Sequence, residues 1–166
     1  MSQKNASSYL SNYLKKPDNE QFAEFEYYPP SDEAAAFFIV ALEKNQQHSG
    51  WIVLQFASNR INKILTERQE LGRTGEVYLV NQKHLMLTDS RFIENSTILR
   101  QKVDTLAVKE AFQTSISEKI TSDYRGINVF SSSEKFELMG IQWVIVAEID
   151  EDEIITNQYK KYKSYF

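Results

Sequence analysis

Two short apolar runs joined by a polar connection constrain this chain most strongly. Residues 35–42 read AAFFIVAL and residues 51–57 read WIVLQFA, with the polar residues 43–50 between them. Each run is too short for a helix of ordinary length and is rich in residues that favour strands. A connection of this length is common between antiparallel strands. We therefore predict a buried β-hairpin and a core built on a sheet.

The rest of the chain alternates strand and helix signals. The expected elements, in chain order, are a short amphipathic helix around residues 9–14, a helix over 58–70 capped by Ser58 or Asn59, a second hairpin over 76–80 and 84–88, a largely helical stretch over 90–120, strands over 126–136 and 143–149, and a final helix over 150–166. Residues 22–28 alternate only partly and stop at two prolines. Sequential hairpins around a crossing helical segment favour an antiparallel sheet with helices on a face, which is an α+β fold.

Composition excludes several classes of function. Hydrophobic residues make up 42% and charged residues 25%, which is ordinary for a domain with a packed core. The formal net charge of −4 argues against nucleic-acid binding, because the basic cluster at Lys160, Lys161 and Lys163 is too short for such a surface. The sequence has no cysteine, so thiolate metal sites, thiol nucleophiles and disulfides are excluded.

No catalytic or metal-binding motif emerges from the residues. The two histidines, His48 and His84, lie in a loop and at a hairpin and belong to no nucleophile elbow. Gly72 and Gly75 lack the lysine of a phosphate-binding loop. The acidic run at residues 150–153 lacks the spacing and central glycine of a calcium loop, and suits the start of a helix. We predict that the chain is not an enzyme and needs no cofactor or metal.

Five segments between residues 71 and 150 resemble the double Cache (extracellular PAS-like) sensor domains of bacterial chemoreceptors, histidine kinases and cyclases. LGRTGEVYLV at residues 71–80 is similar to the family's "LGxTGExYLV", and LMLTDSRF at residues 85–92 to its "LMRSDSRF". The segments VDT with AV at residues 103–108 and DYRG at residues 123–126 follow in the family's order. WVIVAEID at residues 143–150 is similar to its "WxLVAEID" closing strand.

The first part of the chain is more loosely similar to the membrane-distal module of that family, through EFE at residues 24–26 and the apolar runs that follow. Two departures stand out. Leu87 occupies a position where the family usually has arginine, and the first two strands of a distal module would have to precede residue 8. The resemblance implies an incomplete membrane-distal segment at residues 1–70, and a complete membrane-proximal module with a C-terminal output helix at residues 71–166.

The resemblance also implies a function. Such a domain lies on the periplasmic or extracellular side of the bacterial inner membrane, attached through transmembrane helices. No run of about 20 apolar residues is present in this sequence, so those helices would lie outside it. A small ligand, such as an amino acid or an organic acid, would bind between the sheet and its lid, and the terminal helix would transmit the change. The resemblance leaves room for a homodimer.

Eight residues are candidates for ligand contact under this interpretation: Tyr78, Asp89, Ser90, Arg91, Asp123, Tyr124, Arg125 and Phe130. A polar cluster just after a strand can hold a carboxylate or an amine. Each cluster also has a structural explanation, because residues 89–91 and 123–126 can fix turns, and Tyr78 and Phe130 can belong to the core.

Two other functions fit the same residues. The module could bind no small molecule and act through dimerisation or protein contact, which the leucine at position 87 also suits. A cytoplasmic PAS domain is a third interpretation, weakened by the similarities at residues 72–76 and 147–150.

Overall fold

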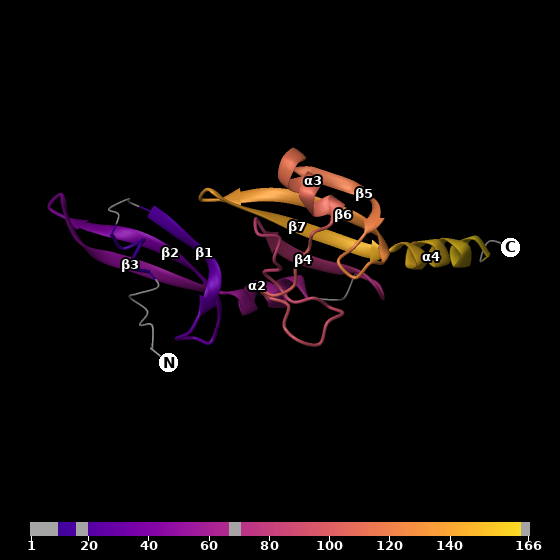
Figure 1. Cartoon of the computed structure of the whole chain (residues 1–166), viewed down its shortest axis with the longest axis horizontal. Helices are drawn as coiled ribbons and strands as arrows, with labels where there is room; N and C mark the ends of the chain where they lie inside the picture. Colours follow the sequence, from indigo (N-terminus) through magenta and orange to yellow (C-terminus); the bar gives the residue numbers. More distant parts are fainter. Residues whose placement is uncertain (1–9, 16–19, 67–70, 164–166) are drawn as a thin grey trace. The chain divides into compact units, whose positions relative to one another are not determined.

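A computed structural model of the chain describes residues 10–15, 20–66 and 71–163, of which residues 160–163 are described by their backbone. Contacts divide the chain near Ile61 into two compact units, each with its own antiparallel sheet (Figure 1). The end of helix α2 (Ser58–Leu65) belongs to the second unit, in which the side chain of Asn62 donates to the Asp89 carboxylate at 3.0 Å. The boundary between two modules at residue 70 stays a prediction.

The first unit contains three strands in the order β1-β2-β3. Strands β2 (Glu33–Lys44) and β3 (Gln47–Ala57) form the predicted hairpin, with Ala41 opposite Trp51. Strand β1 (Glu20–Tyr28) was absent from the predicted strand order. Its pairing with β2 is irregular between Ala23 and Glu26, and such a bulge disturbs the twofold alternation by which strands are recognised.

The segment before β1 differs from the short helix expected there. Within the described residues 10–15 the backbone makes one turn, in which the N–H groups of Tyr13 and Leu14 both donate to the carbonyl of Leu10. Leu10 is buried against the first unit's core with Ala35, Phe37 and Ile39. A single turn is enough to place the side chain of Leu10 in the core, so a longer helix is not required for its burial.

The second unit contains a sheet in the order β4-β7-β6-β5. Strands β6 (Asn128–Leu138) and β7 (Ile141–Asp150) lie close to the expected ranges, and β4 (Glu76–Asn81) pairs antiparallel with β7. The first strand of the unit therefore lies beside the last one. The predicted α+β architecture, with antiparallel sheets and helices, is confirmed.

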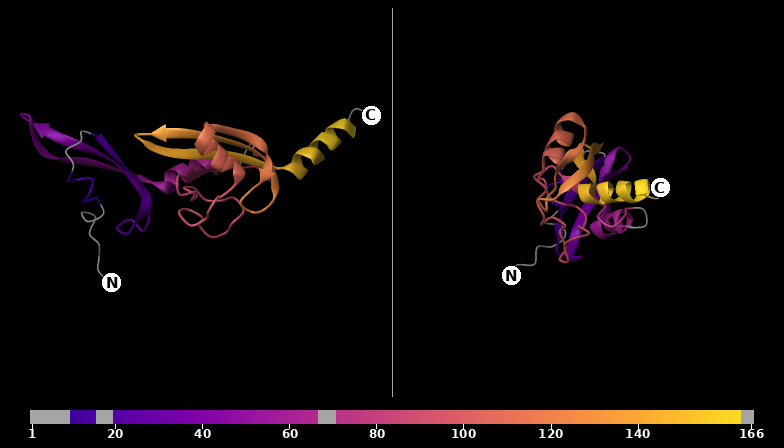
Figure 2. Two further views of the ribbon diagram at one scale, coloured as in Figure 1. Left: turned by 45° about the horizontal axis from the view of Figure 1, so that its top comes forward. Right: turned by 90° about the vertical axis from the view of Figure 1, so that its right-hand side faces the viewer.

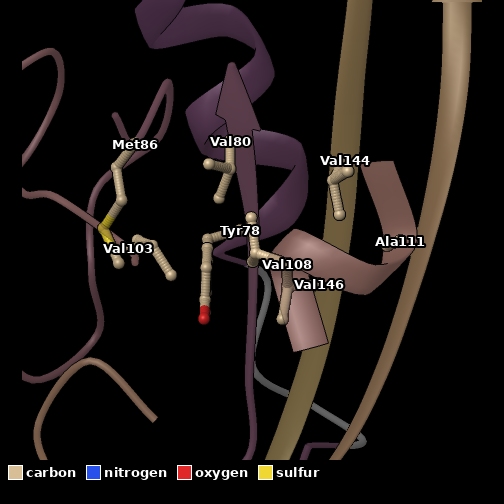
Figure 3. Close-up of a cluster of buried hydrophobic side chains, with 8 residues drawn as sticks. All are labelled: Tyr78, Val80, Met86, Val103, Val108, Ala111, Val144 and Val146. Atoms are coloured by element: carbon tan, nitrogen blue, oxygen red, sulfur yellow. The ribbon is translucent and has the colours of Figure 1, made fainter. Parts of the chain in front are cut away.

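One face of this sheet carries the core of the second unit. Tyr78 and Val80 of β4 stand opposite Val146 and Val144 of β7, and all four are buried. They face Val108 and Ala111 of helix α3 (Leu106–Thr114), with Met86 and Val103 from the connecting loops (Figure 3).

The stretch predicted as helical over 90–120 is helical only in α3, and strand β5 (Ile116–Ser122) follows at once. Thr105 caps the start of the helix, where its hydroxyl accepts a hydrogen bond from the N–H of Val108. Ser115 ends it with a positive φ of 78°, and its N–H donates to the carbonyl of Ala111. The apolar period that predicts a helix up to Phe112 says nothing about this abrupt end.

Residues 84–88 do not form the second strand of a hairpin. They return alongside β4, where Val80 and Met86 make an isolated bridge and the N–H of Leu87 donates to the carbonyl of Leu79. The turn is held by Asn81, whose side-chain oxygen accepts from the N–H groups of Lys83 and Leu85. The main partner of β4 is β7, so local sequence identified the turn but not the pairing.

Helix α4 (Glu151–Lys163) begins directly after β7 and extends beyond the end of the sheet (Figures 1 and 2). The predicted helix over 150–166 is thus observed up to residue 163, and residues 164–166 lie outside the described part. Three acids occupy its first turn, where the helix dipole favours negative charge.

We expect Met86→Ala to lower the free energy of unfolding by about 2–5 kcal/mol, because Met86 is fully buried in the core and its loss leaves a cavity. Leu106→Ala is the matched control, since Leu106 is 53% exposed and its truncation should change stability by roughly 0.5 kcal/mol or less. Urea denaturation followed by circular dichroism measures both. Equal losses in the two variants would contradict the core assignment.

Candidate functional site

Two carboxylates face each other across the β4–β7 pair. Glu76 is opposite Glu148, and both side chains are buried. The Glu76 carboxylate accepts the N–H of Arg91 at 2.5 Å and the hydroxyl of Tyr124 at 2.7 Å. The hydroxyl of Tyr78 donates to Oε2 of Glu148 at 2.8 Å. The sheet therefore brings two acids from distant parts of the sequence into one buried polar network.

Three of the predicted site residues belong to this network through their side chains, and Arg91 belongs to it through its N–H. The rings of Tyr78 and Tyr124 meet edge to face with centroids 5.6 Å apart. The hydroxyls of Tyr124 and Ser90 are 2.6 Å apart, and the Ser90 N–H donates to the hydroxyl of Thr97. Residues 78, 90 and 124, which lie far apart in the sequence, are thus adjacent in the fold.

Asp89 and Arg91 fix the loop that follows β4. The Asp89 carboxylate accepts from the Asn62 side chain and from the Thr97 N–H. The Arg91 guanidinium donates to the carbonyls of Gly75 at 2.6 Å and of Gly72 at 3.1 Å. These bonds agree with the structural explanation given above, in which residues 89–91 fix a turn. Contact of Asp89 or Arg91 with a ligand stays a prediction.

Asp123 and Arg125 form a second local cluster. The Asp123 carboxylate accepts the N–H groups of Arg125 and Ile127 and pairs with Nε of Arg125 at 2.6 Å. The same guanidinium donates to Asp150 at 2.7 Å and lies 4.0 Å from the ring centre of Phe92. This cluster ties the turn before β6 to the end of β7, and its contact with a ligand is likewise a prediction.

Phe130 points to the opposite face of the sheet. Along β6 the buried residues are Val129, Ser131 and Ser133, and the residues between them are exposed. That outer face borders a cleft of about 800 Å³. Its floor includes outward residues of three strands: Ile120, Phe130, Ala147 and Ile149. Its wall includes residues of a loop and of α4: Leu71, Gly72, Glu153 and Asn157. Among the eight predicted residues, all of them described, Phe130 alone lines this cleft.

Three of the other predicted residues bond to residues that line the cleft. Arg91 bonds to Gly72 and Gly75, and Tyr124 bonds to Glu76. Tyr78 bonds to Glu148, which also borders the cleft. The polar network on the inner face therefore holds the walls of a space that opens on the outer face.

Glu153 of α4 binds the loop at the mouth of the cleft. Its carboxylate accepts the N–H groups of Arg73 at 2.9 Å and Thr74 at 2.7 Å, and the hydroxyl of Thr74 at 2.5 Å. The Thr74 hydroxyl also accepts the N–H of Asp150 at 3.2 Å. Gly72 has a φ of 66°, and a Cβ there would lie 2.8 Å from Oε1 of Glu153. The positive φ favours glycine at that position, and the Glu153 carboxylate would have to shift to admit a side chain there.

Three acids of the site were not among the residues predicted from the sequence: Glu76, Glu148 and Glu153. For Glu148 the signal is visible, because it interrupts the apolar strand run WVIVA and is followed by a helix. A charged residue within such a run is buried only with partners. Glu153 carries no comparable signal, since it lies in an acidic run that looks like an ordinary helix start.

Burial changes the proton affinity of this network. Burial raises the pKa of Glu148 to about 7, and the nearby charges of Asp123 and Glu76 act in the same direction. Its Oε1 has no hydrogen-bond partner among the described residues. Burial, followed by the charge of Glu148, raises the pKa of Tyr78 well above its ordinary value. Glu153 differs, because its bonds to Thr74 and Arg73 hold the pKa of its carboxyl below the usual range.

Within the described residues, no group of three or more His, Asp or Glu side chains is arranged to hold a metal ion. None of the helices in the described part combines the length and the apolar character that crossing a membrane requires.

Solved structures with a similar fold include ligand-binding domains of chemoreceptors and the extracellular domain of a histidine kinase. The ligand-binding domain of the Pseudomonas fluorescens chemoreceptor CtaA in complex with L-leucine has a TM-score of 0.53 and 14% identity, and the match covers 86% of this chain and 58% of that one. The extracellular domain of mmHK1S-Z3, named as a histidine kinase, has a TM-score of 0.64 and 14% identity, covering 96% and 59%. The Pseudomonas aeruginosa amino acid chemoreceptor PctC in complex with GABA has a TM-score of 0.59 and 16% identity, covering 90% and 65%.

These matches establish the fold, and the chain has the Cache-type α+β architecture that the sequence predicted. The neighbours are ligand-binding domains of chemoreceptors and histidine kinases rather than enzymes. This chain spans less than two thirds of the length of the three domains described above. No family model matches the sequence, and no curated protein matches it either.

The buried Glu148 predicts a pH dependence of stability. Its folded-state pKa of about 7 lies above the ordinary value of 4.5, so the folded chain holds this proton more tightly than the unfolded chain. The free energy of unfolding should therefore fall as the pH rises from about 4.5 to about 7, by no more than about 3 kcal/mol. Glu148→Gln should remove this slope, because the amide mimics the protonated acid.

Chemical denaturation between pH 4.5 and 8 measures the effect. Glu94→Gln is the control, because Glu94 is exposed and its substitution should leave the slope unchanged. A slope that survives in Glu148→Gln would assign the titration to another group.

Proposed function

We propose that this chain is an extracytoplasmic sensor domain of a bacterial transmembrane signalling receptor, in which a small ligand bound beside α4 changes the position of that helix. One observation carries the proposal. The cleft of about 800 Å³ is lined by the sheet on one side and by Glu153 and Asn157 of α4 on the other. A molecule held there touches both the rigid part of the unit and the element that leaves it.

The coupling passes through the loop that Glu153 binds. Glu153 holds Arg73 and Thr74, while Gly72 and Gly75 of the same loop border the cleft and are held by Arg91. A ligand shifts an equilibrium only by its difference in affinity for two states. In the first state the bonds from Glu153 to Arg73 and Thr74 hold the loop against the first turn of α4, and in the second state these bonds are broken.

The lining residues favour a small molecule with an apolar part and a positive charge. Ile120, Phe130 and Ile149 supply an apolar floor and Glu118 adds a negative charge beside it, whereas the ammonium of Lys119 is paired with Glu110. The side chain and the ammonium group of an amino acid match this combination. Several neighbouring structures contain amino acids, so amino acids are the first probes to use.

The proposal assigns residues 1–70 to a membrane-distal segment and residues 71–166 to a membrane-proximal module whose output helix is α4. Membrane spans outside this chain would attach it to the periplasmic or extracellular face of the inner membrane. Tyr78, Arg91 and Tyr124 would act by holding residues of the cleft wall, and Ser90 by its contact with Tyr124. Asp89, Asp123 and Arg125 would act by fixing the neighbouring turns, and Phe130 by direct contact.

The second candidate is a ligand-free module that acts by dimerisation or protein contact. The inner face of the second sheet favours it, because the side chains of Tyr78, Met86, Val103 and Val108 fill the space between sheet and α3 (Figure 3). Under this alternative the polar network has a purely structural role.

A thermal-shift screen with amino acids, organic acids and amines separates the two candidates. A true ligand should raise the melting temperature in a saturable way, by a few degrees at about 100 times Kd. Ala147→Trp should abolish the shift, because Ala147 is an exposed residue on the floor of the cleft and the indole would occupy the space where a ligand contacts that floor. Ile116→Trp, on the outer face of β5 but outside the cleft, should retain it. No saturable shift with any compound would favour the ligand-free module.

Glu153→Ala should release the loop from α4. The backbone amides of Arg73 and Thr74 lose their acceptor, so their hydrogen exchange should become roughly tenfold faster or more. Asp152→Ala is the matched control, since it removes an exposed acid from the same helical turn without touching these bonds. Exchange rates that are equal in the two variants would contradict the coupling.

A further inference from the structure

The two acids that face each other on the buried side of the second sheet are not equally supplied with hydrogen-bond donors. Both oxygens of Glu76 accept a hydrogen bond, one from the N–H of Arg91 and one from the hydroxyl of Tyr124. Glu148 accepts the hydroxyl of Tyr78 on Oε2, and its Oε1 has no partner among the described residues. A buried carboxylate with an unpartnered oxygen is costly in its charged form, so Glu148 is the acid of the pair that holds a proton.

The groups that surround Glu148 also oppose its ionisation. Glu76 from β4 and Asp123 from the loop before β6 both bring negative charge near it. The hydroxyls of Tyr78 from β4 and Ser131 from β6 favour the charged form, but burial outweighs them. The buried residues of α3 are apolar, and no lysine or arginine in the described part of the chain forms an ion pair with Glu148. Ionisation therefore places an uncompensated negative charge directly opposite Glu76.

This pair of acids lies next to the junction between α4 and the loop that precedes β4. Thr74 comes shortly before Glu76 in the chain and Asp150 shortly after Glu148, and the Asp150 N–H donates to the Thr74 hydroxyl at 3.2 Å. Glu153, in the first turn of α4, accepts two backbone N–H groups of the same loop. A change in the spacing of the two acids therefore acts directly on the bonds that join the loop to the helix.

We propose that the Glu76–Glu148 pair is a proton-controlled switch of this junction. With Glu148 neutral, the adjacent ends of β4 and β7 stay paired and the loop stays bonded to α4. With Glu148 ionised, like charges on neighbouring strands repel, and the bonds from the loop to Asp150 and Glu153 are released. The proposal rests on the proposed function in one respect, because it takes this junction as the output of the sensor. Proton and ligand would then favour the same joined state, so that each increases the affinity for the other.

Hydrogen exchange of the whole chain, without ligand, tests the switch between pH 4.5 and 8. The joined state holds the Glu148 proton more tightly than the released state, so release becomes easier as the pH rises toward about 7 and levels off above it. The protection factors of the loop amides of Arg73 and Thr74 should fall about fivefold or more over this range. The turn amides of Lys83 and Leu85, bonded at the other end of β4, should keep theirs.

Glu148→Gln is the decisive variant, because the amide is neutral at every pH. It should keep the loop amides at their low-pH protection throughout, while Glu94→Gln, which changes an exposed acid outside the network, should follow the wild type. Three results would each overturn the proposal: loop protection that does not change with pH, a pH dependence that survives in Glu148→Gln, or a parallel fall at the turn amides. No ligand enters this experiment. Its failure removes the proton switch alone, whereas failure of the ligand screen removes the proposed function.

Discussion

The pairing of β4 with β7 is the interaction on which the second unit depends. It joins the first and last strands of the unit and so places Glu76 opposite Glu148. Burying two carboxylates next to each other costs free energy unless hydrogen-bond donors or protonation compensate for the lost hydration. Tyr78, Tyr124 and the backbone of Arg91 provide that compensation, and for Glu148 the proton affinity changes as well. The residues that satisfy the acids are also the ones that fix the surrounding loops.

For the proposed function this matters because the residues of the polar network bond to Glu76 and Glu148, which line the cleft. The network lies on the inner face, where it is bonded to itself, and the cleft opens on the outer face beside α4. Glu153 then connects the cleft to the helix through a loop that contains a glycine with no room for a side chain. A sensor needs a rigid part, a movable part and a ligand that touches both, and this arrangement supplies such a geometry.

Local patterns identified most elements correctly, and the failures have specific causes. The hairpin of β2 and β3 was predictable because both strands are continuous apolar runs. Strand β1 was missed because its bulge breaks the alternation, and β5 because a positive φ at Ser115 ends α3 abruptly. Among the candidate site residues, the positions in the turns could be singled out from the sequence, since their polar side chains are conspicuous there. The acids that organise the site were missed, because only the pairing of distant strands brings them together.

The sequence by itself determined the α+β class, the absence of thiol chemistry, and the resemblance to sensor domains. These follow from composition and from local periodicity, which need no knowledge of distant contacts. The tertiary structure alone decided which strands are neighbours, which face each side chain occupies and where a cleft forms. Those properties depend on contacts such as Glu76 with Tyr124 and Thr74 with Glu153, whose partners are separated by 48 and 79 residues. Such contacts are fixed by the packing of the whole unit, because no local segment contains both members of the pair.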